Sequence, residues 1–177
     1  MNTRPVTRRQ FLRGASCFAL LASVAPRGLR AAPRLDTNPF ALGVAAGDPL
    51  PDGMVIWTRL APKPLEAHGG MPMTAMPVRW EVAEDDRFSR VVRRGVELAR
   101  PELGHSVHVE VGGLKPQRPY WYRFHLDDAS STIGRARTAP AIGSLPDNIR
   151  IAVAGCQHYE AGHYTAYQHL AIDGEFD

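Results

Sequence analysis

The residues best suited to chemistry cluster in one short segment, where Cys156 follows Gly155 and precedes His158 and His163. A thiolate binds transition metals and attacks electrophilic centres, and a helix N-terminus or a nearby cation favours it over the thiol. Cys156 therefore has two possible chemical roles. As a metal ligand it needs further ligands, and as a nucleophile it needs a base such as His158 or His163. A third interpretation is structural, because free cysteine is often a small buried hydrophobe.

The histidines give weaker signals than the cysteine. His158, His163 and His169 lack the four-residue spacing that places two imidazoles on one helical face, so we interpret them as surface or supporting positions. His105 and His108 are interpreted as solvent-facing strand residues, because His108 alternates out of phase with the neighbouring valines. We assign no role to His105 and His108.

The elements around Cys156 predict the start of an α/β domain. Residues 149–154 are β-branched and small, which is typical of a buried strand in a covered sheet, and residues 161–172 have the character of a helix. Ligands collect at the carboxyl ends of strands in such sheets, and Cys156 lies at such an end, which favours a functional role. The unit over 149–177 is too short to bury a core, so we expect a truncated chain or gene fragment.

The preceding region predicts a β-sandwich. Seven short β-runs are separated by Gly, Pro and Asp clusters, at a spacing typical of sandwiches. They cover residues 40–46, 54–60, 78–84, 91–98, 106–111, 120–126 and 132–138. Alternation of apolar and polar residues is clearest within 107–111 and recurs within 121–126, which indicates strands with one face packed inward and one face in water.

The connections between these runs carry local signals of their own. Residues 62–77 have no strong period and predict a long loop, and residues 140–148 have the composition of a linker. The sequence around Leu114 that leads to Tyr120 and Tyr122 resembles the entry to the penultimate strand of fibronectin type III domains. There a tyrosine corner ties the loop to the strand, so Tyr120 or Tyr122 is expected to be structural.

Charge is distributed unevenly along the chain. The composition, 44% hydrophobic and 22% charged, excludes a disordered tail or a collagen-like repeat. The chain has 21 Lys and Arg against 18 Asp and Glu, but residues 1–32 contain six arginines and no acid. The remainder thus has 15 bases against 18 acids, a net charge of about −3, and no nucleic-acid partner is indicated.

The first 32 residues predict an export signal. A basic head precedes an apolar run over 14–25, which is too short to span a bilayer and is typical of a signal-peptide core. Arg8 and Arg9 followed by Phe11 are similar to the bacterial twin-arginine signal, whose export machinery would be their partner. We expect residues 1–32 to be removed and the product to be periplasmic or extracellular, without a stable membrane anchor.

Export makes the remaining cysteine unusual. The chain has two cysteines, and Cys17 lies in the predicted leader, so Cys156 would be the one thiol of the mature chain. An internal disulfide is then impossible, although the compartment is oxidising. A lone exported cysteine favours a functional explanation.

Taken in order, the leader, the sandwich and the Gly-Cys-Gln segment resemble the PhoD-type alkaline phosphatase family. The resemblance covers essentially the whole chain. The matching stretches after the leader are 38–49, 55–60, 78–82, 120–124, 134–138, 154–157 and 164–167.

The resemblance implies a mainly β fold with two parts. An immunoglobulin or fibronectin III-like domain, expected over 38–140, precedes the truncated first β-α unit of an α/β metallophosphatase domain, expected over 149–177. The family hydrolyses phosphomonoesters and phosphodiesters with iron and calcium, and Cys156 matches its cysteine ligand to ferric iron. The other ligands come from a Gly-Asp-x-x-Tyr motif and from Asn, Asp and His positions beyond residue 177. The 177-residue fragment is therefore expected to be inactive.

A second hypothesis is a non-catalytic exported β-sandwich that serves as a binding module. The nucleotide sequence downstream discriminates the two, since an open frame with Gly-Asp-x-x-Tyr within a few dozen codons supports the phosphatase.

Overall fold

The computed structural model describes residues 35, 37–156, 158, 160, 162–174 and 176. The predicted leader over 1–32, with Arg8, Arg9 and Cys17, lies outside the described residues.

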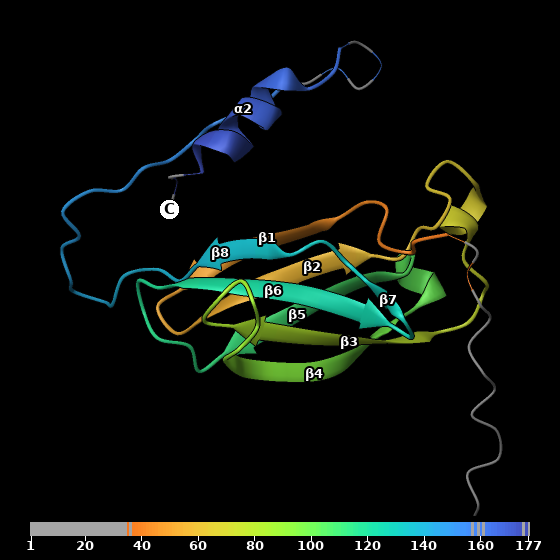
Figure 1. The fold of residues 1–177 in the computed structure, drawn as a ribbon, viewed down its shortest axis with the longest axis horizontal. Helices are drawn as coiled ribbons and strands as arrows, with labels where there is room; N and C mark the ends of the chain where they lie inside the picture. Colours follow the sequence, from red (N-terminus) through yellow and green to blue (C-terminus); the bar gives the residue numbers. More distant parts are fainter. Residues whose placement is uncertain are drawn as a thin grey trace, which may run out of the picture. The chain divides into compact units, whose positions relative to one another are not determined.

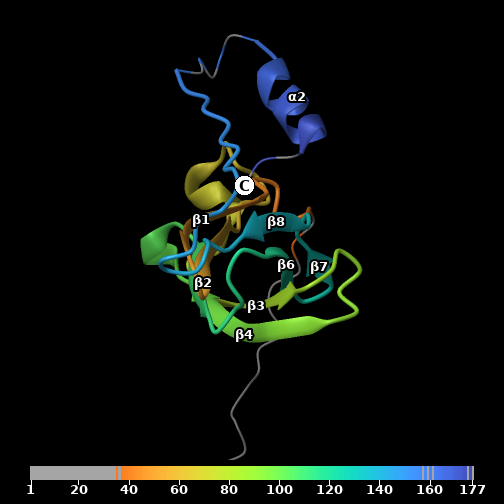
Figure 2. The ribbon, with the colours of Figure 1, turned by 90° about the vertical axis from the view of Figure 1, so that its left-hand side faces the viewer.

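Most of the regular secondary structure of the described chain lies in two antiparallel sheets (Figures 1 and 2). The first has the order β1-β2-β5. The second has the order β4-β3-β6, and both β7 and β8 pair with β6. The strands are β1 (Val44–Leu50), β2 (Gly53–Arg59), β3 (Met76–Ala83), β4 (Val91–Ala99), β5 (Ser106–Gly112), β6 (Pro119–Leu126), β7 (Ala129–Ser130) and β8 (Gly134–Arg137).

The core lies between the two sheets and follows the predicted alternation. Every second residue of β2, β5 and β6 is buried, while His108 and Glu110 on β5 are exposed as expected. The buried set includes Met54, Ile56, Thr58, Val107, Val109, Val111, Tyr120, Tyr122, Phe124 and Leu126. The predicted mainly β fold is thus confirmed.

Each of the seven predicted β-runs overlaps a strand, and the first differs most from expectation. Strand β1 begins at Val44 instead of residue 40, because a turn comes first: the Gly43 N–H donates to the Phe40 carbonyl at 2.9 Å. Gly43 has a φ of +75°, a conformation that glycine adopts without strain. Phe40 is buried within this turn.

The tyrosine corner is confirmed and belongs to Tyr120. Its ring is buried at the start of β6, and its hydroxyl accepts the backbone N–H of Lys115 at 2.9 Å. The buried Thr138 secures the same loop, because its hydroxyl donates to the Lys115 carbonyl at 2.7 Å and accepts the Arg118 N–H at 3.1 Å. The loop before β6 is therefore held from two sides.

The loop predicted over 62–77 is irregular up to the start of β3 at Met76, apart from the short 3₁₀ turn η1 (Ala67–Gly70). A second 3₁₀ turn, η2 (Pro101–Leu103), precedes β5.

The prediction for His105 is wrong, because this residue is fully buried. It lies just before β5 with a φ of +57°, so it does not share the alternation of that strand. Its ring Nε2 is 3.1 Å from the Thr74 carbonyl oxygen in the long loop. Among the described residues, its Nδ1 is the one buried side-chain polar atom without a hydrogen-bond partner.

The segment after residue 140 differs from the predicted β-α unit. Residues 149–154 form no strand and are exposed, with Val153 at 91%. A strand in a covered sheet needs hydrogen-bonding neighbours, and the described chain supplies none here. Helix α2 (Thr165–Asp173) is shorter than the expected 161–172 and has no buried residue. Within the described residues, no helix is long and apolar enough to cross a membrane.

Candidate functional site

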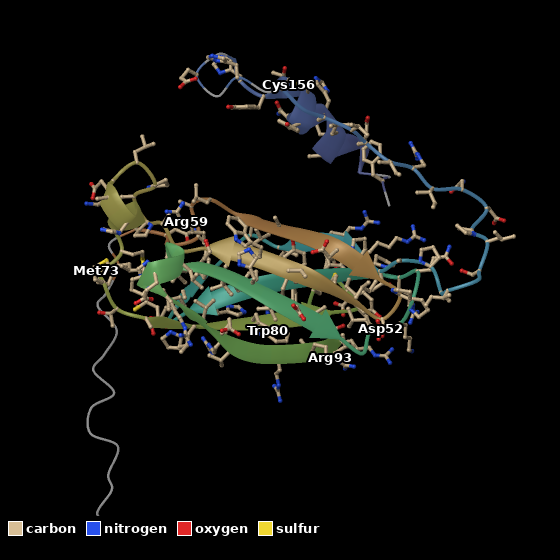
Figure 3. The ribbon with its side chains drawn as sticks, turned by 180° about the vertical axis from the view of Figure 1, so that it is seen from behind. Asp52, Arg59, Met73, Trp80, Arg93 and Cys156 are labelled. Carbon is tan, nitrogen blue, oxygen red and sulfur yellow. The ribbon has the colours of Figure 1, made fainter. Side chains whose placement is uncertain are left out.

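Cys156 is an exposed free thiol on an irregular segment (Figure 3). Its φ is +55°, and the helix that follows begins only at Thr165. The predicted position between a strand end and a helix start is therefore not formed in this structure. The interpretation of Cys156 as a buried hydrophobe is also wrong, because the residue is exposed.

The histidines near Cys156 lie at the surface, as predicted. His158 Nδ1 is 3.5 Å from a carboxylate oxygen of Glu160, and both side chains are largely exposed. His163 and His169 are exposed as well. The described residues contain no group of three or more His, Cys, Asp or Glu that could hold a metal ion.

Cys156 meets only one requirement of an iron site. A thiolate is a strong donor to iron, and the exposed position leaves it accessible to a metal. A metal that activates water and holds phosphate oxygens needs several fixed ligands. The described part of the chain supplies one donor without a surrounding cluster, so it does not form a complete iron or calcium site.

An ionic cluster on the second sheet was not anticipated from the sequence. The Glu81 carboxylate on β3 accepts hydrogen bonds from Arg123 on β6 at 2.5 Å and lies 3.3 Å from His125 Nε2. The Arg123 guanidinium is also 3.9 Å from the ring centroid of Phe88, a cation–π contact. The strand register explains the cluster, because Glu81 is directly opposite Arg123.

The electrostatics of the cluster favour a charged carboxylate. Partial burial of Glu81 raises its pKa, but hydrogen bonds from Arg123 and His125, together with their charges, outweigh it, and the pKa is lowered. Glu81 is thus held ionised as a link between two strands. An ionised carboxylate with these partners is poorly suited to act as a general acid.

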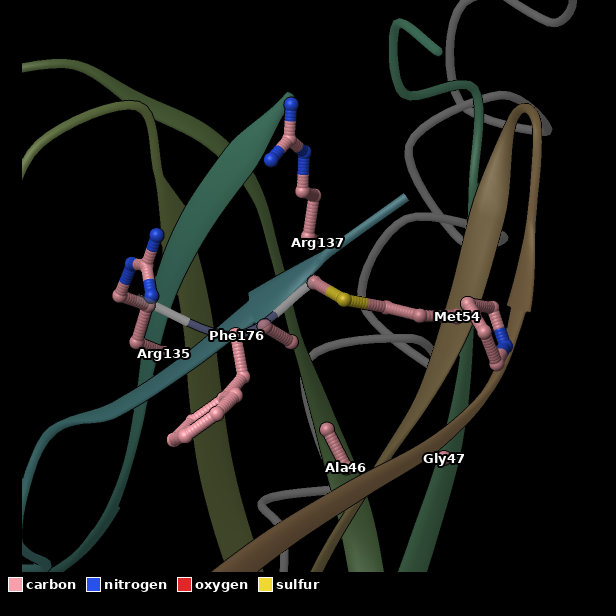
Figure 4. A pocket seen from close by; sticks show the side chains of 8 residues that line it. Ala46, Gly47, Met54, Arg135, Arg137 and Phe176 are labelled. Atoms are coloured by element: carbon pink, nitrogen blue, oxygen red, sulfur yellow. The ribbon is translucent and has the colours of Figure 1, made fainter. Parts of the chain in front are cut away.

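Two hollows have basic linings. One, of about 380 Å³, lies over β3, β4 and β6 and is lined by Arg79, Trp80, Glu81, Arg94, Gly95, Val96 and His125. The other, of about 360 Å³, is lined mainly by β1 and β8, and Figure 4 shows Arg135, Arg137 and Met54 around it. Cys156 lines neither hollow.

A family model, a curated relative and a solved structure all relate this chain to PhoD-type phosphatases. The family described as "PhoD-like phosphatase, N-terminal domain" matches residues 24–140. "Alkaline phosphatase D" of Bacillus subtilis (strain 168) is 49% identical over 171 residues, which is 93% of this chain and 29% of the relative. The solved "Structure of PhoD" superposes with a TM-score of 0.77 and 53% identity, covering 79% of this chain and 27% of that one. The chain therefore spans less than a third of either protein.

Proposed function

The chain belongs to the PhoD-like phosphatase family through its N-terminal domain, and on that premise we propose that it is the N-terminal portion of an exported, metal-dependent alkaline phosphatase and phosphodiesterase. The observation that carries the proposal is the 49% identity to alkaline phosphatase D over 93% of the chain. The family model matches only up to residue 140. The alignment with alkaline phosphatase D covers 93% of the chain, so it must extend beyond that residue.

The proposed domain organisation follows the sequence boundaries. Residues 38–140 would be an immunoglobulin or fibronectin III-like domain, and the buried tyrosine corner and the two-sheet arrangement support this class. Residues 149–177 would begin the metallophosphatase domain. The exposed side chains of Ile149, Ile151 and Val153 would then be covered when the remaining strands of that domain pair with this segment.

Cys156 is proposed as one ligand of an iron centre in the longer protein, with calcium as the second metal. The remaining ligands would come from the parts of the relatives that this chain does not span. When bound, the metals would activate water and stabilise charge on the phosphate ester. Phosphate-ester hydrolysis has one of the largest uncatalysed barriers, so a site with a single ligand is expected to give no measurable turnover.

The decisive test compares the full-length protein with the 177-residue chain on an aryl phosphate monoester and diester. The full-length protein should hydrolyse both, and the 177-residue chain should stay at the uncatalysed rate. Turnover by the 177-residue chain, or an inactive but folded and metal-loaded full-length protein, would reject the proposal.

A further inference from the structure

Strand β4 is an open edge of the second sheet. Among the described residues, β3 is the one strand that pairs with it, and Figures 1 and 2 show β4 at the margin of that sheet. Most of its side chains are exposed, and Val96 and Leu98 remain 60% and 41% accessible. An edge strand presents backbone N–H and C=O groups without strand partners, so it can accept a further strand by backbone hydrogen bonding.

Every second residue of β4 directs its backbone groups away from β3. Leu98 is opposite Pro77, which has no N–H to donate, and the Leu98 N–H is accepted by the carboxylate of Glu97 at 3.0 Å. The Leu98 N–H therefore points to the open edge. Because the backbone groups of an antiparallel strand alternate in direction, those of Arg94 and Val96 point to the same edge.

The charges of β4 are self-complementary about Gly95. If two β4 strands pair antiparallel with Gly95 on the two-fold axis, Arg93 of each copy lies opposite Glu97 of the other. The symmetry makes this pair of opposite charges occur twice. Between them Arg94 lies opposite Val96, whose exposed side chain the aliphatic stem of the arginine can cover.

Neighbouring registers lose this match. Centring the two strands on Arg94 would place that arginine opposite itself, and like charges directly opposite each other are destabilising. Centring them on Val96 would place Arg93 and Glu97 opposite uncharged residues. The register centred on Gly95 also uses a regular part of β4, because the register shift between β3 and β4 falls before Arg93.

Arg93 can form the new ion pair and keep most of its present contacts. Its Nε donates to the Gly112 carbonyl at 2.8 Å and its Nη2 donates to the Gly113 carbonyl, whereas its Nη1 donates to the Val92 carbonyl of β4 itself (Figure 3). A guanidinium group has five N–H donors, so Nη1 can turn to a carboxylate while the contacts with residues 112 and 113 persist. Glu97 is exposed and is released when the Leu98 N–H binds a second strand.

We propose that two copies of this chain associate through their β4 strands, antiparallel and centred on Gly95, so that their second sheets join into one continuous sheet. The outward backbone groups of Arg94 in one copy bind those of Val96 in the other. Two ion pairs between Arg93 and Glu97 fix the register. The association uses the sandwich alone, so it does not depend on the proposed function.

Sedimentation equilibrium of the 177-residue chain tests the association. The unaltered chain should show a dimer fraction that rises with concentration. Arg93→Glu and Glu97→Arg should each raise the Kd of the dimer about tenfold, because each variant places like charges opposite each other at two positions. The double variant Arg93→Glu/Glu97→Arg restores opposite charges and should bring the Kd back to within about threefold of the original.

The matched control is Arg135→Glu, which reverses the same charge on an exposed residue of β8. Strands β3 and β6 separate this residue from β4, so the Kd should change less than about twofold. Glu97 contacts only the backbone of its own strand, so Glu97→Arg should keep the melting temperature and isolate association from folding. Hydrogen exchange at the amides of Arg94 and Val96 should slow as the concentration of the unaltered chain rises.

Three results would overturn the proposal: a chain that stays monomeric at every concentration, a double variant that remains as weak as the two single variants, or slowed exchange confined to residues outside β4. None of them affects the proposed function, which is tested by turnover of the full-length protein. Equal weakening by Arg135→Glu would likewise reject the pairing of Arg93 with Glu97.

Discussion

At the scale of single residues, two neighbouring tyrosines of β6 have different roles. The Tyr120 hydroxyl accepts the Lys115 N–H and so fixes the loop before the strand. The Tyr122 ring packs against Gly134, where an added Cβ would lie 2.2 Å from the ring Cζ. In the part of the chain that the structure describes, the Tyr122 hydroxyl has no hydrogen-bond partner. The two residues therefore form a matched pair for testing the tyrosine corner.

Tyr120→Phe should lower the free energy of unfolding by about 1–2 kcal/mol, because it leaves the partly buried Lys115 N–H without its acceptor. Tyr122→Phe removes a hydroxyl that has no hydrogen-bond partner among the described residues. It should lower the free energy of unfolding by less than about 0.5 kcal/mol. Urea unfolding monitored by circular dichroism measures both. Equal losses in the two variants would contradict a special role for Tyr120.

The raised pKa of Tyr122 predicts that the stability of the fold changes at alkaline pH. Burial raises the pKa of Tyr122 from 10.0 to about 12. A pKa that is higher in the folded state stabilises the fold fully below the unfolded pKa and loses that contribution as the pH rises through 10 towards 12. Tyr122→Phe should therefore lose less stability than the unaltered chain between about pH 9 and pH 11.5. Parallel pH profiles in urea unfolding would argue against this.

How far single residues could be predicted depended on the sequence distance of their partners. The tyrosine corner is local, since Lys115 and Tyr120 are five positions apart, and its signal was visible in the sequence. His105 contacts Thr74, 31 positions away, through a loop without a period, so its burial could not be anticipated. The same holds for Glu81 and Arg123, which only the strand register brings together.

At the scale of elements, the alternation of apolar and polar residues predicted the strands that bury one face, such as β2, β5 and β6. Their pattern is complete within each strand, so neighbours are not needed to recognise it. The run over 149–154 has no alternation and predicted a strand covered on both faces. Such a strand depends on partners, and in the described chain it is exposed and irregular.

Hydrogen exchange should separate these two kinds of element. Amides of 149–154 should exchange at unprotected rates in the 177-residue chain, whereas those of β6 that pair with β3 should be strongly protected. In the full-length protein the amides of 149–154 should become protected, because the proposed sheet would be complete. Protection of 149–154 in the 177-residue chain, or its absence in the full-length protein, would contradict this account of the segment.

At the scale of the whole molecule, net charge was a poor guide to surface charge. A net charge of about −3 outside residues 1–32 gave no support to polyanion binding. Arg79, Arg94, Arg123 and Arg135 are far apart in the sequence, and the pairing of four strands places them on one face of the second sheet. The net charge sums the charges of the whole surface, so it could not show that arginines gather on one face of the second sheet.

The proposed export of the whole protein rests on residues 1–32. A receptor that recognises two adjacent guanidinium groups should not accept other side chains, even charged ones. Replacing Arg8 and Arg9 by Lys should retain a reporter fusion in the cytoplasm, while Arg27→Lys and Arg30→Lys together should leave export intact. Undiminished periplasmic reporter activity in the Arg8/Arg9 variant would indicate an ordinary secretory leader.

The central claim, that Cys156 is a ligand of an iron centre completed by the rest of a longer phosphatase, is tested most directly by metal content in the full-length protein. Cys156→Ala should lose bound iron, measured by mass spectrometry, together with turnover of an aryl phosphate ester, while the far-UV circular dichroism of the sandwich stays unchanged. Cys17, the other cysteine of the chain, lies in the predicted leader, so any thiolate ligand of this chain's part of the mature protein would be Cys156. Unchanged iron and unchanged turnover in Cys156→Ala would contradict the claim.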